Sequence, residues 1–349
     1  MTASALFGEP VVPPPDRPAH LTERAAHSVL LGIANAGPRL VAVGERGIIV
    51  RSDDAGRTWR QSPSPVSVTL TAVHFANDKE GWAVGHYGVV VHSADGGETW
   101  HRQLDGAAAA ALALDAAQAR ARGTPDDDRV RQALAAAQLL VRDGADKPFL
   151  DVHFFDASHG LVVGAYNMIF ATADAGRTWQ PLLDRTDNRE ALHLYALAAA
   201  GDRVYVAGEQ GLLLFSSDRG ATFRRVATPY HGTFFTALAR DGGDVVVAGL
   251  RGHAYVSTDD GATWKALDVP GDAAIAAVGA IDAERLVVVG ERGVYVSDAT
   301  RRRFTEVAIP GLAPVNAVAR ASDGAWVVAT LRGVVRVERE VVEQASGRP

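Results

Sequence analysis

Short runs of apolar, β-branched residues recur along the chain, and each run stops at a glycine or a polar turn. Residues 39–61 show the arrangement: one apolar run ends at Gly44, a two-residue step leads to Gly47, and a second apolar run ends near Arg51. Runs of this length and composition favour β-strands, and the paired glycines mark a tight hairpin turn. The polar segment Ser-x-Asp-x-Gly-x-Thr-Trp follows, which predicts a second tight turn before the next strand.

This unit returns at intervals of about forty residues, with one interval roughly twice as long. A fixed period of this size is typical of repeat architectures. Seven copies can be aligned on the hairpin turn, two of them with a substitution in the glycine pair. The aligned pairs are Gly44/Gly47, Gly85/Gly88, Gly164/Asn167, Gly208/Gly211, Gly249/Gly252, Gly290/Gly293 and Ala329/Gly333.

The polar half of the unit is well kept in five copies. We expect its hydroxyl and carboxylate groups to bond nearby backbone N–H groups, its glycine to be left-handed, and its aromatic ring to lie between neighbouring sheets. We identify the segment as the Asp-box, or BNR, repeat, and we assign its residues a structural role. They are Asp54, Trp59, Asp95, Trp100, Asp174, Trp179, Asp218, Phe223, Asp259 and Trp264.

A further strand precedes each copy, and its second position is Ala, Gly or Asp, as expected where innermost strands converge near an axis. Four strands in each of seven units predict an all-β, seven-bladed β-propeller over residues 29–338, as a single domain. Residues 1–28 are then an N-terminal extension and residues 339–349 a C-terminal tail. The outer strand of blade seven is poorly marked, and either residues 5–12 or residues 341–344 could supply it and close the ring.

The long interval is explained by residues 105–147, which are rich in Ala and Leu and show no strand alternation. Thr124 as N-cap, Pro125 at the first helical position and three following Asp residues predict a helix start. One helical face then carries Val130, Leu134, Ala137 and Val141. We interpret the segment as an α-helical hairpin inserted between blades two and three. It either contacts a partner or simply lies on the rim.

Topology sorts the turns onto two faces. In an up-and-down blade, the Gly-x-x-Gly turns and the blade-to-blade crossovers lie on one side, and the Asp-boxes lie on the other. Four arginines in the Gly-x-x-Gly turns would converge around the axis, where guanidinium groups can bind carboxylates and stack on aromatic rings. Alternatively they are solvated turn residues, two of them paired with the adjacent Glu45 and Glu291. The candidate partner-binding residues are Arg46, Arg251, Arg292, Arg332, His86, Tyr87, Tyr166, Asn167, Tyr195 and Tyr230.

Composition narrows the possible functions. The formal net charge of −6 does not indicate a general nucleic-acid binder. The absence of cysteine excludes disulfides, thiol catalysis and cysteine metal sites. The 11 histidines show no metal-binding spacing, so we predict no metal site and no cofactor. No apolar stretch is long enough for a membrane span, so we expect no membrane insertion, and no signal peptide is visible.

The repeats, together with DKPFLDVHF, VVGAYNMIF and PYHGTFF, resemble the family of photosystem II assembly and stability factors. More narrowly, they resemble its bacterial relatives encoded beside resistance-nodulation-division transporters. The resemblance covers about residues 29–338. It implies a non-enzymatic scaffold that docks a membrane-protein partner, either a transporter or a photosystem-type subunit, on its arginine-bearing face. It also implies a periplasmic or cell-envelope location, with the cytoplasm as the alternative because no signal sequence is visible.

Two other function classes stay open. Sialidase-like glycoside hydrolases also carry Asp-boxes on propellers, but they need an arginine cluster, a tyrosine activated by a glutamate, and an acidic general acid. No such constellation is legible in this sequence. The third class is a small-ligand or metal-binding envelope propeller. His74 and His153 occupy the same place in two blades, which indicates repeat ancestry more than metal ligation.

Overall fold

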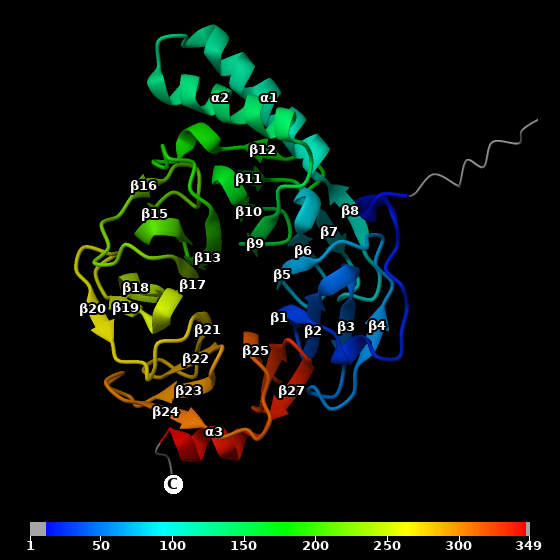
Figure 1. Ribbon diagram of the computed structural model, residues 1–349, viewed down its shortest axis with the longest axis vertical. Coiled ribbons are helices and arrows are strands. Elements are labelled where there is room, and N and C mark those ends of the chain that lie inside the picture. The colour runs from blue at the N-terminus through cyan, green and yellow to red at the C-terminus, as the bar shows by residue number, and fades with distance from the viewer. Residues whose placement is uncertain (1–11, 347–349) are drawn as a thin grey trace, which may run out of the picture.

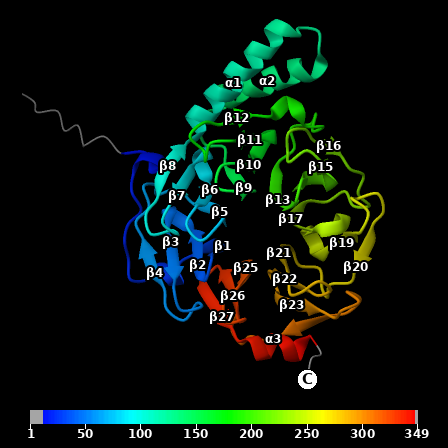
Figure 2. The same cartoon turned by 180° about the vertical axis from the view of Figure 1, so that it is seen from behind.

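The chain folds into a closed ring of antiparallel sheets around a central axis (Figures 1 and 2). This computed structural model describes residues 12–346. Six sheets have four strands and the seventh has three. Each innermost strand contacts the innermost strands of both neighbouring blades, and blade one meets blade seven in the same way. The predicted seven-bladed propeller is therefore confirmed.

The strands run outward from the axis in chain order within each blade. Blades one and two contain β1 (Leu30–Ala36), β2 (Arg39–Gly44), β3 (Ile49–Ser52), β4 (Arg60–Ser62), β5 (Leu70–Phe75), β6 (Gly81–Gly85), β7 (Val90–Ser93) and β8 (His101–Leu104). Blades three and four contain β9 (Phe149–Phe154), β10 (Gly160–Gly164), β11 (Ile169–Thr172), β12 (Gln180–Pro181), β13 (Leu194–Ala200), β14 (Arg203–Gly208), β15 (Leu213–Ser216) and β16 (Arg224–Arg225). Blades five to seven contain β17 (Phe234–Arg240), β18 (Asp244–Gly249), β19 (Ala254–Ser257), β20 (Lys265–Leu267), β21 (Ile275–Ala280), β22 (Leu286–Gly290), β23 (Gly293–Ser297), β24 (Phe304–Val307), β25 (Val315–Arg320), β26 (Trp326–Thr330) and β27 (Gly333–Val337).

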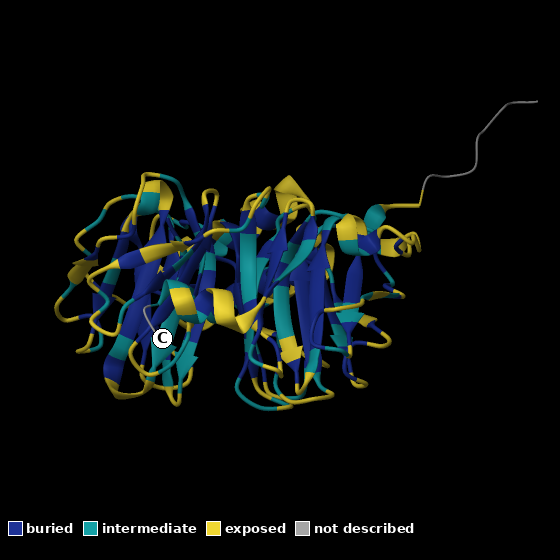
Figure 3. Ribbon diagram, turned by 90° about the horizontal axis from the view of Figure 1, so that it is seen from below, coloured by how far each residue is buried: buried dark blue, intermediate teal, exposed yellow. Residues whose placement is uncertain are grey.

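The core lies between adjacent blades. The second strand of each blade is buried along its length because both of its faces are covered, as in Leu40–Val43 of β2 and Val245–Ala248 of β18. This explains why these strands read as continuous apolar runs rather than as alternating patterns. Figure 3 shows the result: buried strands span the thickness of the disc, and exposed residues concentrate in the loops at its two faces.

Every innermost strand carries a β-bulge at the same place, one residue after its first paired position. A bulge leaves one residue unpaired and changes the direction of its side chain. Here it falls at the end of the strand next to the Gly-x-x-Gly turn. The seven bulged residues are Leu31, Thr71, Leu150, Tyr195, Phe235, Ala276 and Asn316.

The insertion forms two antiparallel helices, α1 (Gly106–Gly123) and α2 (Asp128–Asp143), which stand on the outer edge of blade three (Figure 1). Helix α1 packs on β12 through small residues that allow close approach, including Ala109, Ala113 and Ala117. Within residues 12–346, no helix combines the length and the hydropathy needed to cross a membrane.

Two details of the predicted second helix were wrong, its N-cap and one residue of its buried face. Thr124 is not the N-cap of α2: its N–H donates to the Arg120 carbonyl and ends α1. Asp127 caps α2 instead, because its carboxylate accepts from two N–H groups of the first turn. The buried face of α2 consists of Val130, Ala133, Ala137 and Leu140. Val141, which we expected on that face, is 46% exposed.

No segment among the described residues adds a fourth strand to blade seven. Residues 341–344 are not that strand, because they belong to helix α3 (Arg339–Ala345), which buries Val342 in the core of blades six and seven. Helical spacing buries that one side chain while Val341 stays exposed. The other candidate, residues 5–12, lies outside the described residues except for Val12.

The described part of the N-terminal extension, residues 12–28, forms a strap along the outer edge of blades one and two (Figure 1). It contains the short 3₁₀ helices η1 (Pro14–Asp16) and η2 (Ala25–His27). Helix η2 lies against β27 and against β3 and β4, so it touches blades seven and one. Arg102 of β8 donates to the Pro15 carbonyl and pairs with Asp16 at 2.7 Å. The strap therefore spans three consecutive blades across the point where the ring closes.

Candidate functional site

The Gly-x-x-Gly turns of blades one to five share a geometry that exposes their middle side chain. In each, a single 3₁₀ turn holds its middle residue, which is not glycine, at a positive φ of 53° to 59°. The first glycine is extended, but a Cβ on Gly44 would lie 2.0 Å from the Val29 carbonyl oxygen, so close backbone approach requires glycine there. These turns are η3 (Glu45–Gly47), η4 (His86–Gly88), η5 (Ala165–Asn167), η7 (Glu209–Gly211) and η9 (Leu250–Gly252).

A repeated hydrogen bond places all seven turns on one face. In every blade, the N–H of the first turn residue donates to the backbone carbonyl near the start of the innermost strand, over 2.9 to 3.2 Å. The seven donors are Glu45, His86, Ala165, Glu209, Leu250, Glu291 and Leu331. We call the surface formed by these turns and by the residues that lead into and begin the innermost strands the turn face.

The four predicted arginines occupy the turns of blades five, six, seven and one, which are consecutive around the ring. All four residues are exposed. Within residues 12–346, Arg46, Arg251 and Arg332 form no ion pair; Arg292 lies 3.4 Å from Asp272, but both side chains are more than 60% exposed and the pair is weak. We call these four residues the arginine arc.

The suggested pairing of Glu45 with Arg46 does not form. The Glu45 carboxylate instead accepts a hydrogen bond from the Val29 N–H at 3.0 Å, which ties the turn to the innermost strand. Glu209 makes the equivalent bond to the His193 N–H at 2.9 Å. Both glutamates support their own turns, and the bond of Glu45 to the backbone leaves the charge of Arg46 without a paired carboxylate among residues 12–346.

Aromatic side chains occupy the other part of the turn face. Tyr87 and Tyr166 stand at the exposed middle position in blades two and three and are 36% and 42% exposed, and His86 is exposed beside Tyr87. The Tyr166 ring meets His193 edge to face at 4.6 Å, and the Lys147 ammonium lies 5.8 Å from its centre. A cation over an aromatic ring at this distance is mildly attractive.

The aromatic surface continues across blades four and five. Tyr195 and Phe235, both at bulge positions, meet edge to face at 5.3 Å. Tyr230 packs on His253 at 4.2 Å and donates its hydroxyl to the Leu250 carbonyl at 3.0 Å. We call the set Tyr87, Tyr166, Tyr195, Tyr230 and Phe235 the aromatic arc. It lies next to the arginine arc and completes the ring of blades.

One predicted partner-binding residue is buried. Asn167 is 5% exposed and replaces the second glycine of its turn, with a positive φ of 59° that Asn tolerates better than most residues. Its amide donates to the Leu183 carbonyl at 3.1 Å and to the Thr186 hydroxyl at 2.9 Å, and Asn188 donates to its carbonyl oxygen at 3.0 Å. Asn167 therefore anchors the crossover between blades three and four and presents no surface to a partner.

Three residues of the face were absent from the sequence prediction: Lys147, Phe235 and His253. Phe235 carried a usable signal, because it is the second residue of its innermost strand β17, as Tyr195 is of β13 in the preceding repeat. Lys147 and His253 carried none, since each reaches an aromatic ring across a turn whose geometry the repeat does not specify.

The Asp-boxes lie on the opposite face and form a regular hydrogen-bond pattern, shown here by blade two. The Ser93 hydroxyl donates to Asp95 at 2.8 Å and accepts from the Gly97 N–H at 2.8 Å. One Asp95 oxygen accepts from the N–H groups of Glu98 and Thr99 at 2.9 Å, and the other accepts from the Thr99 hydroxyl at 2.6 Å. The remaining four boxes repeat the two threonine bonds.

These bonds stabilise the charged form of each Asp-box carboxylate. Hydrogen bonds from Thr263 and Ser257 lower the pKa of Asp259 to about 2. For Asp95, burial alone would raise the pKa, but the bonds from Thr99, Ser93 and Glu98 hold it below its usual value. The carboxylates are fully used inside their own turns, which fits a structural role.

Buried polar groups near the axis also bond between blades. Burial raises the pKa of Asp151 to about 7, although its carboxylate accepts from the Leu197 N–H of the next blade at 2.7 Å. The rings of His74 and His153 lie 4.6 Å apart, and burial lowers the pKa of both, to about 3 and about 4. In the described part of the chain, no three potential metal-ligating side chains cluster together.

The tyrosine chemistry of a sialidase is not assembled on the turn face. Burial, and then the charge of Glu209, raise the pKa of Tyr195, which makes its phenolate harder to form. Glu209 also accepts from the His193 N–H, so its carboxylate is already bonded to the backbone. The arrangement therefore suits binding of charged and aromatic groups better than nucleophilic catalysis.

Comparisons of the sequence and of the fold with known proteins point to the same family. The sequence matches the family described as photosynthesis system II assembly factor YCF48 over residues 26–122 and 135–334. A curated relative, the photosystem II assembly lipoprotein Ycf48 of Synechococcus sp. (strain CC9902), is 36% identical over 77 residues, which span 22% of this chain and 23% of that protein. The chain thus matches less than a quarter of that relative's length.

Two solved structures share the fold over almost the whole chain. The structure described as YCF48 bound to D1 peptide has a TM-score of 0.65 at 13% identity, covering 92% of this chain and 96% of that one. YCF48 from Cyanidioschyzon merolae has a TM-score of 0.64 at 16% identity, covering 90% and 97%. At such identities the likeness shows the fold alone. Because the family match extends over both sides of the inserted hairpin and most of the ring, the chain belongs to the photosynthesis system II assembly factor YCF48 family.

Proposed function

We propose that this protein is a non-enzymatic assembly scaffold whose turn face holds an extended segment of a membrane-protein partner. Carboxylates of that segment would bind the arginine arc, and its apolar or aromatic side chains would pack on the aromatic arc. The observation that carries the proposal is the contiguity of three unpaired arginines and one weakly paired arginine beside exposed tyrosines. A planar guanidinium beside aromatic surface is a common anchor in protein interfaces.

The charge balance supports the same reading. The chain carries a formal net charge of −6, so four exposed arginines in consecutive turns run against the overall charge. Glu45, the carboxylate beside Arg46, is occupied by the Val29 N–H group, whereas Arg292 has Glu291 next to it in sequence and pairs weakly with Asp272. An acidic ligand would therefore meet uncompensated positive charge on this face.

The relatives suggest the class of partner. One solved structure of the same fold is described as bound to a D1 peptide, and the curated relative is described as a lipoprotein that serves photosystem II assembly. By analogy, we place this protein in the periplasm or cell envelope. Its partner is then a membrane protein, either a photosystem-type subunit or a transporter of the resistance-nodulation-division type.

The test is crosslinking from the turn face in cells, followed by mass-spectrometric identification of the captured protein. The fourfold variant Arg46→Ala, Arg251→Ala, Arg292→Ala, Arg332→Ala removes the arginine arc without touching a buried group. Each exposed charged contact contributes up to about 1 kcal/mol, so we expect capture to fall by about tenfold or more.

A matched control removes the same charge from the Asp-box side. Arg60, Arg177, Arg302 and Arg303 are exposed and form no ion pair within residues 12–346. Their fourfold alanine variant should capture the partner as the parent protein does. If capture survives loss of the arginine arc and is lost instead when residues 106–143 are removed, the contact site is the helical hairpin and the turn-face proposal fails.

A further inference from the structure

A second concave surface lies away from the turn face, at the junction of blades three and four. It consists of two adjoining cavities of about 370 Å³ and about 420 Å³, and Arg185 contributes to the lining of both. Each is in the size range of ligand sites in proteins. We call the combined surface the blade 3–4 groove. Its walls come from Asp-box loops and from the crossover after β12, so it is separate from both arcs described above.

The first cavity is mainly apolar. Its lining includes Phe155, Leu161, Trp179 and Leu182, and Arg219 covers the Phe155 ring at 5.0 Å. Trp179 is 5% exposed, and its indole N–H has no acceptor among the described residues. The equivalent tryptophans of blades one and two both donate to a glycine carbonyl at 3.1 Å. Blade three thus keeps an unused donor beside an apolar cavity.

The second cavity is positively charged. Arg129, Arg185 and Arg224 line it, and none of the three forms an ion pair within residues 12–346. Of the two carboxylates in the lining, Asp184 is neutralised by Arg120, which leaves only Asp187 to balance three guanidinium groups. The cavity thus has an excess of positive charge, although the whole chain has a formal net charge of −6. Arg224 is held in place by stacking on Phe215 at 4.8 Å.

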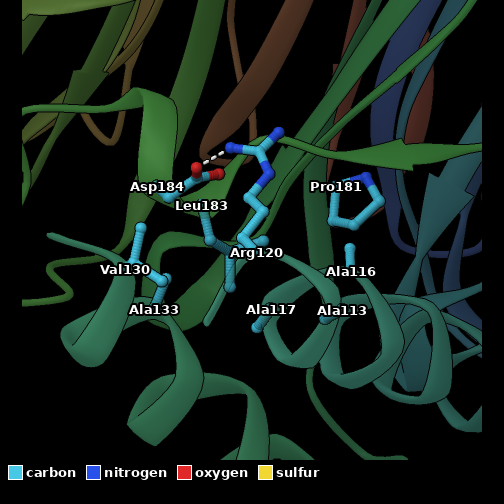
Figure 4. A pocket seen from close by; sticks show the side chains of 9 residues that line it. All are labelled: Ala113, Ala116, Ala117, Arg120, Val130, Ala133, Pro181, Leu183 and Asp184. Carbon is cyan, nitrogen blue, oxygen red and sulfur yellow. Dashed lines mark ion pairs between the residues drawn. The ribbon is translucent and has the colours of Figure 1, made fainter. Parts of the chain in front are cut away.

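The inserted hairpin builds one wall of this groove. Arg129 belongs to the first turn of α2, and the ion pair of Arg120 with Asp184 fixes α1 to the short helix η6 (Leu183–Arg185) (Figure 4). The crossover then pairs with the residue that precedes the outer strand of blade four, because the Phe223 N–H donates to the Arg185 carbonyl at 2.8 Å. The hairpin, the crossover and blade four therefore form one fixed unit around the positive cavity.

We propose that the blade 3–4 groove binds an acidic segment of a partner protein that carries an apolar side chain. The apolar side chain would enter the cavity beside Trp179 and Leu182, and flanking carboxylates would meet Arg129, Arg185 and Arg224. The insertion then serves as a binding element, and the protein has a second contact surface that does not depend on the turn face. Loss of one surface leaves the other intact, so the two proposals can fail separately.

The probe is a fluorescein-labelled peptide, Glu-Asp-Leu-Phe-Asp-Glu, with a photoreactive benzophenone in place of the Phe ring in a second version. Fluorescence anisotropy with the full chain measures affinity at low ionic strength. The double variant Arg129→Glu, Arg224→Glu changes two exposed side chains, so the fold should be retained. We expect it to weaken peptide binding by at least about tenfold, because two attractive contacts become repulsive.

The control variant is Arg122→Glu, Arg302→Glu, which reverses one charge on the hairpin and one on the Asp-box side, both outside the groove. It should bind the peptide as the parent does, and so should the fourfold alanine variant of the arginine arc. The benzophenone should crosslink to residues of the groove, around 155–185 and 215–224. Crosslinks confined to other blades, or equal binding by a peptide with Lys in place of every acidic residue, would overturn the proposal.

Discussion

At the residue scale, the Asp-box carboxylates show how one side chain can fix a whole turn. Each accepts a backbone N–H group and the hydroxyl of the same threonine, and Asp54 and Asp95 accept a second backbone N–H group, in the way that an N-cap residue satisfies the start of a helix. The pattern explains why Ser, Asp, Gly and Thr recur together at fixed spacing. Ser and Thr contribute hydroxyl donors, Asp contributes the acceptor, and Gly adopts the left-handed backbone that the turn requires.

We therefore expect Asp95→Ala to lower the free energy of unfolding at pH 7 by about 1 to 2 kcal/mol, the usual effect of losing a capping side chain. The pKa of Asp95 is lower in the folded protein than in the unfolded chain. Its contribution is thus complete above the unfolded value of about 3.9 and is lost as pH falls through the folded value below it. Urea denaturation at pH 7 and near pH 3 should show the difference between variant and parent shrinking in acid.

Asp115→Ala is the control for this experiment. Asp115 is exposed on α1 and forms no hydrogen bond or ion pair in the described region. Its loss should change stability by less than about 0.5 kcal/mol at either pH. A pH-independent loss in Asp95→Ala, equal at pH 7 and pH 3, would show that lost packing rather than the charged hydrogen bonds explains the effect.

Asn167 marks the limit of what a repeat can predict about single residues. The alignment showed that it replaces a turn glycine, and its place on the turn face suggested exposure. Its burial depends on the crossover at residues 183–188, which the other blades do not share. The fold follows from features that every copy repeats, whereas the detail of the candidate site depends on loops that occur once.

At the scale of elements, the hairpin is held to the propeller by small side chains and by one ion pair. Helix α1 buries only alanines and Gly106 against the ring, so its apolar contacts are modest. The Arg120 and Asp184 side chains are 30% and 14% exposed, which makes their pair better shielded than most surface pairs. The sequence predicted both helices from composition and periodicity, but the partner of Arg120 lies 64 residues away and could not be read from it.

We expect Arg120→Ala to loosen the hairpin selectively. The change leaves Asp184 without its partner and should cost the hairpin contact about 1 to 3 kcal/mol. Hydrogen exchange measured by mass spectrometry should then become faster in peptides from residues 106–143, with the strands of blades five to seven unchanged. Arg122→Ala, on the exposed side of the same helix, should leave the exchange pattern as it is. Equally slow hydrogen exchange of residues 106–143 in both variants would mean that the alanine contacts alone hold the hairpin.

At the scale of the whole molecule, the ring closes without strand exchange between the described ends of the chain. Blade seven contains only residues from the C-terminal part, and helix α3 covers its junction with blade six. Blade one meets blade seven through innermost strands and through the Asn316 amide, which donates to the Leu30 carbonyl at 2.8 Å. The sequence marks the outer strand of blade seven poorly and offers residues 5–12 or 341–344 for it; residues 341–344 are helical, and residues 5–11 lie outside the described chain.

The N-terminal strap is the element that spans this junction, and its removal provides a test. The strap contacts Arg102 and blade seven, and it also bonds to blade one. The Ala19 N–H donates to the Ser64 carbonyl at 3.0 Å, and the His20 backbone carbonyl accepts from the Gln61 side-chain amide at 3.0 Å. Ala19 and Ala25 are buried. A chain that begins at residue 29 should therefore melt a few degrees lower than the parent by calorimetry, since each 1 kcal/mol lost corresponds to about 1 to 2 °C in a protein of this size. A chain that begins at residue 12 keeps the strap and should melt at a higher temperature than the chain that begins at residue 29. Equal melting of both truncated chains would assign closure to the inner-strand contacts and α3 alone.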